Sequence, residues 1–188
     1  MPFDFSKRFD SAIKYTDFLD THGTPSDQHK WQGVFDSVHL SDAQTQLLKG
    51  FKREMNVLCM AGAWCGDCVK QCPIFHQFEK VSSKIQVRFI DRDADPELAG
   101  ELKVCGGSRV PQVVFLSEEN KLVGRYGDRT LSAYRRMASQ LSGAACSTGL
   151  MTEGDSGLAA VVQDWLNEFE RIQLILRTSP GLRRLHGD

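Results

Sequence analysis

The sequence predicts an α/β fold in which helices flank a central mixed β-sheet, with further helices at both ends of the chain. Within residues 51–145, short apolar runs alternate with helical patterns in the order β-α-β-α-β-β-α. A helix between two strands is typical of a parallel pair, and a short turn is typical of an antiparallel hairpin. Residues 1–50 and 146–188 instead show mainly helical periodicity. We therefore predict one domain over residues 1–188, with a helical extension (1–50), an α/β core (51–145) and a linker with a C-terminal helix (146–188).

Composition excludes several classes of protein. The 188 residues are 41% hydrophobic and 25% charged, an ordinary globular balance that excludes disordered or collagen-like chains. The net charge of −1 provides no basic field for nucleic acid or an anionic membrane. The N-terminal residues are charged where a signal peptide needs an apolar stretch, and no apolar run is long enough to cross a bilayer. We expect a cytoplasmic protein without a nucleic-acid or membrane partner.

Apolar residues recur at helical spacing in the first fifty positions. One helix is predicted over residues 5–19, before the Gly-Thr-Pro turn at 23–25. Ser26 is expected to cap a second helix that carries Trp31 on its apolar face. The spacing at 41–44 is that of a capping box and predicts the start of a third helix. We expect the aromatic residues of this region to pack in the core.

The predicted core then follows in order. Apolar and β-branched runs predict strands, and Pro or Gly residues mark several of the boundaries. The last two strands flank a polar turn and are expected to form a hairpin. The predicted strands are 56–61, 85–91, 113–116 and 122–126, and the predicted helices are 65–81 (interrupted or kinked at Pro73), 96–103 and 130–141.

The C-terminal part begins with residues 142–156, which are rich in Gly, Ser and Ala and predict a linker. From Leu158 to Leu176 one helix face is apolar. We expect this face to dock on the core, and a homodimer through it is the less favoured alternative. Ser179-Pro180-Gly181 should end the helix, and the tail 182–188 should be loosely held.

Six cysteines need an explanation, and two of them form a Cys-x-x-Cys motif between a strand and a helix. Cys65 would lie at the helix N-terminus, where free N–H groups and the helix dipole favour a thiolate. Such placement lowers a thiol pKa from about 8.5 toward roughly 3.5–7.5. We predict that Cys65 attacks a partner disulfide and that Cys68 resolves the mixed disulfide. Gly66 would permit close approach at the helix start.

With these residues in place, the chain resembles the thioredoxin family. The resemblance rests on Ala-Trp-Cys-Gly-Asp-Cys at 63–68, Pro73 in the following helix, and Arg-Val-Pro at 109–111 before a strand. It spans about residues 51–145 and is closest to a WCGDC-containing branch with helices before the first core strand.

The resemblance implies a thioredoxin-like fold and thiol–disulfide oxidoreductase activity. It implies that Pro111 is a cis-proline beside the cysteines and that the backbone of Val110 pairs with an extended peptide. The substrate-binding residues it implies are Trp64, Gly66, Asp67, Val110 and Pro111.

Two departures from the family pattern bear on mechanism. Thioredoxins carry a buried carboxylate six residues before the nucleophile, and here that position is Cys59. A neutral thiol cannot take over proton transfer for Cys68, so we expect slower or differently pH-dependent reduction. Asp67 replaces the usual proline, and its charge should oppose a thiolate on Cys65. We therefore expect Cys65 to be less acidic than in strongly oxidising relatives, which favours a reductant or an isomerase-like exchanger.

Metal-based alternatives start from the same cysteines. Cys65-x2-Cys68-x3-Cys72-Pro73 reproduces the last three cysteines of a ferredoxin run, but the first ligand would fall on Gly62. Mononuclear zinc needs two further ligands, and no second Cys-x-x-Cys exists. Cys72 and His76 are four residues apart on the predicted helix, although both are expected to be ordinary helix residues. We expect no metal and no organic cofactor.

The remaining cysteines have no partner assignable from the sequence. We expect Cys72, Cys105 and Cys146 to be buried or inert. Cys105 lies just before the predicted approach to Pro111, so a regulatory disulfide there is a further hypothesis. For Arg92 and Arg109 two interpretations stay open, an edge of the substrate groove or a solvated loop.

Three functional classes compete. The favoured one is thiol–disulfide exchange with a protein or small-molecule disulfide, sustained by an unidentified electron donor. The alternative is a non-catalytic thioredoxin-like interaction module that uses its helical extensions, although intact Cys65 and Cys68 argue against it. A thiol peroxidase fits less well, because no Thr and Arg constellation typical of peroxide activation stands beside Cys65.

Overall fold

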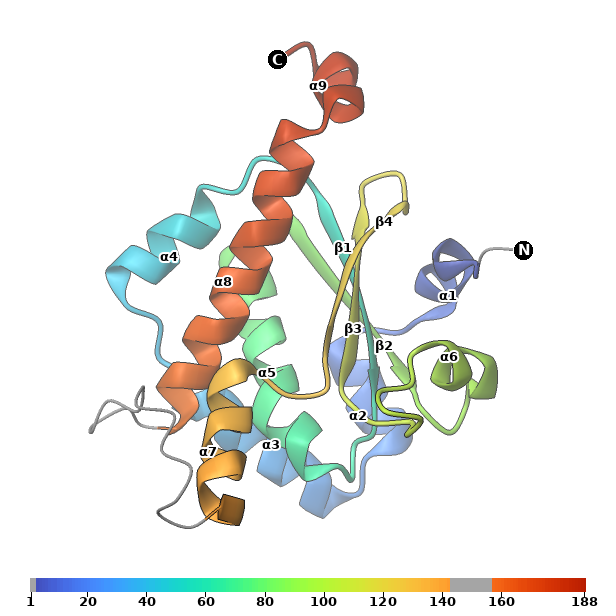
Figure 1. Ribbon diagram of the computed structural model, residues 1–188, viewed down its shortest axis with the longest axis vertical. Coiled ribbons are helices and arrows are strands. Elements are labelled where there is room, and N and C mark those ends of the chain that lie inside the picture. The colour runs from blue at the N-terminus through green and yellow to red at the C-terminus, as the bar shows by residue number, and fades with distance from the viewer. Residues whose placement is uncertain (1–2, 143–156) are drawn as a thin grey trace.

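A computed structural model describes residues 3–142 and 157–188 (Figure 1). Most of the predicted linker 142–156, including Cys146, lies outside the described residues. In the described part of the chain, no helix combines the length and the apolar character needed to cross a membrane.

The centre of the molecule is a four-stranded mixed sheet with strand order β2-β1-β3-β4. β1 pairs in parallel with β2 and antiparallel with β3, and β3 and β4 form an antiparallel hairpin. This confirms the predicted mixed sheet, its parallel first pair and its terminal hairpin. The strands are β1 (Met55–Ala61), β2 (Ile85–Asp91), β3 (Gln112–Ser117) and β4 (Leu122–Gly127).

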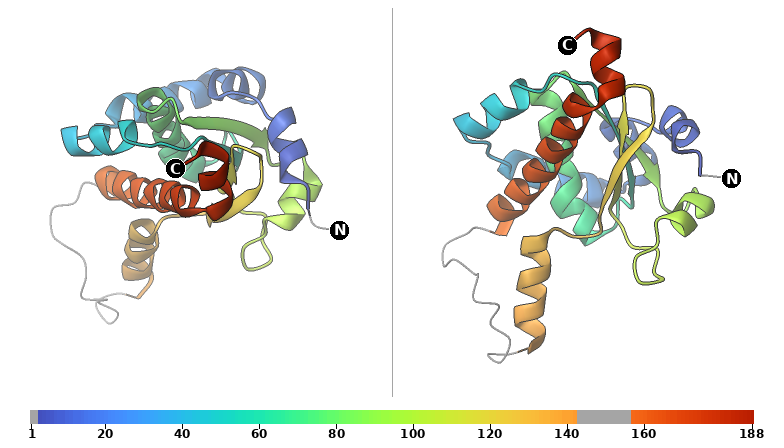
Figure 2. Two further views of the ribbon diagram at one scale, coloured as in Figure 1. Left: turned by 90° about the horizontal axis from the view of Figure 1, so that it is seen from above. Right: turned by 45° about the horizontal axis from the view of Figure 1, so that its top comes forward.

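Helices cover both faces of the sheet. α5 and α8 lie on one face, and α1 and α6 lie on the other (Figures 1 and 2). Because both of its faces are covered, β1 is buried along its whole length, which explains its continuous apolar sequence. The helices are α1 (Phe5–Ser11), α2 (Tyr15–His22), α3 (Pro25–Ser37), α4 (Asp42–Lys49), α5 (Gly66–Val81), α6 (Pro96–Glu101), α7 (Leu131–Ser142), α8 (Gly157–Thr178) and α9 (Pro180–His186).

The predicted helix over residues 5–19 is wrong, because the chain forms two helices with an extended link between them. Ile13 in this link pairs with Phe89 on the outer edge of β2, through N–H···O contacts of 3.0 and 2.7 Å. Pairing with an edge strand satisfies the backbone of Ile13 as well as a helix would. Helical spacing of the apolar residues alone could not distinguish the two arrangements.

The helix starts in this region are set by local caps. Thr24, rather than the predicted Ser26, caps α3, and it forms a capping box with Asp27. Pro25 occupies the first helical turn, where its missing N–H costs nothing. The capping box predicted at Ser41 and Gln44 is confirmed.

The C-terminal helix docks on the core through its apolar face. Trp165 and Phe169 are fully buried, and the Phe169 ring lies 5.2 Å from the rings of both Phe78 and Phe115. The expectation of a loosely held tail is wrong. Ser179 caps α9, Leu182 is buried, and the Asp188 carboxylate pairs with the buried guanidinium of Arg53.

Candidate active site

The turn between β1 and α5 places the two motif cysteines at the start of a helix. Cys65 is the N-cap residue of α5, and its N–H donates to the Gly62 carbonyl at 3.0 Å. Its half-buried sulfur lies 3.6 Å from the carbonyl oxygen of Val110. Cys68 is buried in the first turn, where its sulfur accepts a 3.4 Å hydrogen bond from the Gly62 N–H. One sulfur is therefore accessible and the other is shielded.

The segment before β3 completes this side of the site. The peptide bond between Val110 and Pro111 is cis, and both residues are buried. Within the described residues, no backbone hydrogen bond uses the N–H of Val110. The structure thus brings together Cys65, Cys68, Val110 and Pro111, which are far apart in the sequence.

The two motif sulfurs share one negative charge. Burial opposes a thiolate on Cys68, but hydrogen bonds from the thiols of Cys65 and Cys72 and from the Gly62 N–H outweigh burial and lower its pKa to about 5. The hydrogen bond to Cys68, together with burial and the charge on Cys68, raises the pKa of Cys65. The helix start was expected to favour a thiolate on Cys65, whereas the hydrogen bonds between the neighbouring groups favour the thiolate on Cys68. A thiolate at the accessible sulfur therefore requires a proton to pass from Cys65 to Cys68.

Asp67 is tied into a charged cluster beside the cysteines. Its carboxylate pairs with Arg129, which also lies 3.2 Å from the buried carboxylate of Asp128. Its charge opposes a thiolate on Cys68, while its backbone N–H favours a thiolate on Cys65.

Asp128 is the buried centre of this cluster, with 2% of its surface exposed. Tyr134 donates its hydroxyl to one carboxylate oxygen, and Arg109 and Arg129 approach the other at 3.4 and 3.2 Å. Burial opposes the charge of Asp128, but the hydrogen bonds from Tyr134 and Arg109 and the charge of Arg129 lower its pKa. Arg109 is thus an anchor of this cluster and not only a solvated loop residue.

Trp64 is the exposed residue of the motif, with 53% of its surface accessible. The Arg92 guanidinium lies 4.7 Å from its ring centre, so Arg92 belongs to the rim of the site. Gly62 allows the indole to lie close, since a Cβ at position 62 would come within 2.9 Å of it. Around Gly66, in contrast, a Cβ would meet nothing within 4 Å, so the chain's own packing does not explain that glycine.

Two positioning residues were missed in the sequence analysis. Trp31 of α3 donates its indole N–H to the Ala63 carbonyl at 2.8 Å and so holds the turn that leads to Cys65. Gln71 accepts from the Trp165 indole at 2.9 Å and donates to the Asp128 carbonyl at 3.0 Å. The helical spacing of apolar residues predicted Trp31 only as a core residue. No feature of the sequence indicated a role for Gln71.

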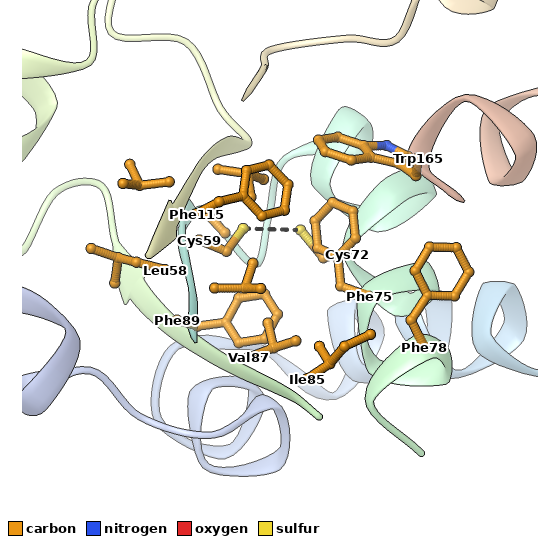
Figure 3. Packing of buried hydrophobic residues seen from close by; sticks show 14 of the residues in the cluster. Leu58, Cys59, Cys72, Phe75, Phe78, Ile85, Val87, Phe89, Phe115 and Trp165 are labelled. Atoms are coloured by element: carbon orange, nitrogen blue, oxygen red, sulfur yellow. Dashed lines mark hydrogen bonds between the residues drawn. The ribbon is translucent and has the colours of Figure 1, made fainter. Parts of the chain in front are cut away.

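The other cysteines differ in burial. Cys59 and Cys72 are fully buried, with their sulfurs 3.8 Å apart (Figure 3). Burial is the main cause that raises the pKa of both thiols. Cys105 is exposed, so of the two predicted alternatives, a buried or an inert thiol, only the inert thiol remains for it. In the described parts of the chain, no group of three or more His, Cys, Asp or Glu side chains is arranged to hold a metal ion.

Comparisons with known proteins agree with this architecture. A family model described as Thioredoxin matches residues 12–141. A crystal structure of a protein of unknown function from Pseudomonas aeruginosa is 19% identical, with a TM-score of 0.71 over 91% of this chain and 97% of that one. An HIV epitope scaffold is 18% identical, with a TM-score of 0.69 over 90% and 97% of the two chains. The search of curated proteins gave no match.

Proposed function

Because the chain belongs to the thioredoxin family, we propose that it is a thiol–disulfide oxidoreductase that reduces or exchanges disulfides through Cys65 and Cys68. One observation carries the proposal. The half-buried sulfur of Cys65 lies at the start of α5 and 3.6 Å from the carbonyl of Val110, directly beside the shielded Cys68. An accessible nucleophile with a protected second thiol is the arrangement that disulfide exchange requires.

The reaction starts from the shared thiolate. The proton of Cys65 passes to Cys68, and the Cys65 thiolate attacks one sulfur of the substrate disulfide. A mixed disulfide forms, and the other substrate sulfur leaves as a thiolate that takes up a proton. Cys68 then gives up its proton and attacks the Cys65 sulfur, which releases the second substrate thiol. The substrate gains two electrons, and the protein keeps a Cys65–Cys68 disulfide.

The neighbouring backbone supplies a means of holding a peptide substrate. Val110 lies beside Cys65 through its carbonyl oxygen, and its N–H has no backbone partner within the described residues. An extended peptide can pair with such a segment as an added strand. Trp64, Asp67 and Pro111 border the same position, and the open space at Gly66 leaves room for the substrate chain.

The proposed setting is a reducing compartment. Such a compartment keeps the Cys65–Cys68 dithiol reduced, which agrees with a cytoplasmic location. The substrate is a protein or small-molecule disulfide, and a dithiol electron donor returns Cys65 and Cys68 to the reduced state. Thiol–disulfide exchange needs no metal or organic cofactor.

Reduction of insulin disulfides with dithiothreitol as electron donor tests the proposal. Wild type should accelerate precipitation of the insulin B chain, and Cys65→Ser should lose that acceleration. Cys105→Ser is the matched control, because Cys105 is an exposed thiol outside the motif. Equal turnover by wild type and Cys65→Ser would contradict the proposal and would favour the non-catalytic interaction module.

A further inference from the structure

A second pair of thiols lies directly beneath the first. Cys59 projects from β1 and Cys72 projects from α5. The two sulfurs therefore meet in the layer where α5 packs on the sheet (Figure 3). Both residues are completely buried, and their sulfurs are 3.8 Å apart. A disulfide requires about 2.05 Å, so a relative shift of about 1.8 Å would bring the two sulfurs to bonding distance.

The surroundings of this pair are apolar. Phe75, Phe89, Phe115 and Trp165 enclose the two sulfurs (Figure 3). No small disulfide in solution can reach atoms so enclosed without opening the core. A disulfide that oxidises this pair must therefore come from within the protein.

Cys68 provides the connection to the surface. It lies four residues before Cys72 on α5, so the two side chains share one face of the helix. Cys72 is also among the neighbours that favour the thiolate of Cys68 and so lower its pKa. Four cysteine sulfurs thus form a path from the surface into the core, in the order Cys65, Cys68, Cys72 and Cys59.

We propose that Cys59 and Cys72 are a second, buried redox-active dithiol, which is oxidised to a disulfide by the Cys65–Cys68 disulfide. The inference rests on the proposed function, because that function supplies the outer disulfide. One molecule then holds four exchangeable electrons, two in each pair, and can reduce two substrate disulfides before its donor must act.

The transfer is two thiol–disulfide exchanges in succession. Cys72 loses its proton and attacks the Cys68 sulfur. The Cys68–Cys72 bond forms, the Cys65–Cys68 bond breaks, and Cys65 leaves as a thiolate that takes up the proton. Cys59 then loses its proton and attacks the Cys72 sulfur, and Cys68 leaves and is protonated. The inner pair loses two electrons, the outer pair gains them, and no further oxidant is consumed.

Tryptic peptides distinguish the two disulfides. Cys59, Cys65 and Cys68 lie together in peptide 54–70, whereas Cys72 lies in peptide 71–80. The outer disulfide is therefore internal to one peptide, and the inner disulfide joins two. Reduced full-length protein would be treated with excess glutathione disulfide, quenched with acid, alkylated with N-ethylmaleimide in denaturant, digested and analysed by mass spectrometry over time.

The internal crosslink of 54–70 should appear first, and a link from 54–70 to 71–80 should follow. If the internal crosslink forms completely while 71–80 stays alkylated, the inference is overturned and the proposed function stands. If the internal crosslink never forms, both are overturned.

Three variants test the route. Cys68→Ser should leave 71–80 alkylated, because the outer disulfide cannot form, and a link in this variant would overturn the inference. Cys59→Ala should keep the internal crosslink and lose the link to 71–80. A persisting link there would show that Cys72 bonds to an outer cysteine instead. Cys105→Ser should behave as wild type. If Cys59→Ala fails to fold, fragmentation of the linked wild-type peptides shows which cysteine of 54–70 is bonded to Cys72, and a bond from Cys65 or Cys68 would overturn the inference.

Discussion

The sulfurs of Cys65 and Cys68 divide one negative charge between an exposed and a buried position. The buried sulfur is the better place for that charge, because the Gly62 N–H donates to it and the neighbouring thiols of Cys65 and Cys72 lower its pKa. The exposed sulfur is the only one that a substrate can reach. The Cys65 sulfur is thus the reactive atom and the Cys68 sulfur is the more acidic one. A proton transfer from Cys65 to Cys68 moves the negative charge to the reactive sulfur.

A pH titration of thiolate absorbance tests this division of roles. The lowered pKa of Cys68, about 5, means that wild type carries one thiolate above that pH and loses it below. Cys68→Ser removes both the stabilised thiolate and the interaction that raises the pKa of Cys65. Its first thiolate should therefore appear only near the ordinary value of about 8.5. A wild-type protein without a thiolate below pH 8 would contradict the shared charge.

The buried carboxylate of Asp128 leads to a second prediction, on how the stability of the protein depends on pH. Its pKa is lowered, so its contribution to stability is present above the ordinary Asp value of about 4 and is lost as the pH falls through the lower folded value. Asp128→Asn should therefore reduce the free energy of unfolding by about 2–3 kcal/mol at neutral pH, and by less in acid. Urea unfolding at several pH values measures this. The exposed Asp20→Asn should show little change, and an equal loss for Asp128→Asn in acid would oppose the argument.

At the scale of elements, α3 supports the turn that leads to Cys65. The indole N–H of Trp31 holds the carbonyl of Ala63, two residues before Cys65. The helical extension therefore helps to hold the backbone of the site in place. This gives the first fifty residues a structural role at the turn that leads to Cys65.

Trp31→Phe removes that hydrogen bond and keeps an aromatic ring in place. We expect a loss of at least about 1 kcal/mol in stability and a slower insulin reduction by the folded variant. Tyr15→Phe is the matched control, because the Tyr15 ring lies 5.7 Å from Trp31 and its buried hydroxyl has no hydrogen-bond partner among the described residues. Removal of that hydroxyl should leave stability unchanged or raise it. Equal insulin reduction by wild type and Trp31→Phe would show that the Ala63 contact is not needed.

The elements also show what the sequence could and could not predict. The β2 boundaries and the capping box at Ser41 were predicted because they depend on neighbouring residues alone. The break at Ile13 and the order of α9 were not, because each depends on a distant partner, Phe89 in one case and Arg53 in the other. At the site, local spacing identified Cys65 and Cys68. The hydrogen bonds of Gln71 with Asp128 and Trp165 could not be predicted, because they form only when α5, α8 and the end of the hairpin pack together.

At the scale of the whole molecule, the N-terminal helices, the sheet, α5 and α8 contribute to one apolar core. Phe18 and Trp31 from the N-terminal helices and Trp165 and Phe169 from α8 are all fully buried. The family match from residue 12 also includes most of the extension. The segment resembling a thioredoxin cannot be separated from its flanks without exposing these contacts.

A fragment of residues 51–142 should consequently fail to unfold cooperatively, whereas the full chain should show one transition. Each large buried side chain that loses its partners forfeits roughly 1.5–3 kcal/mol, and the sum exceeds the usual stability of a domain. Circular dichroism during heating provides the measurement. A chain that lacks only residues 180–188 should still fold, with a lower melting temperature. Cooperative unfolding of the 51–142 fragment would refute the shared core.

The bridge between Ile13 and Phe89 has one more consequence. β2 is the outermost strand on its side of the sheet, and an uncovered outer strand is a template on which other chains can assemble. Ile13 occupies hydrogen-bonding groups of that strand. Proteolytic removal of the first fourteen residues would therefore free part of the strand edge and favour self-association into aggregates, so that the short link between α1 and α2 also protects the colloidal stability of the protein.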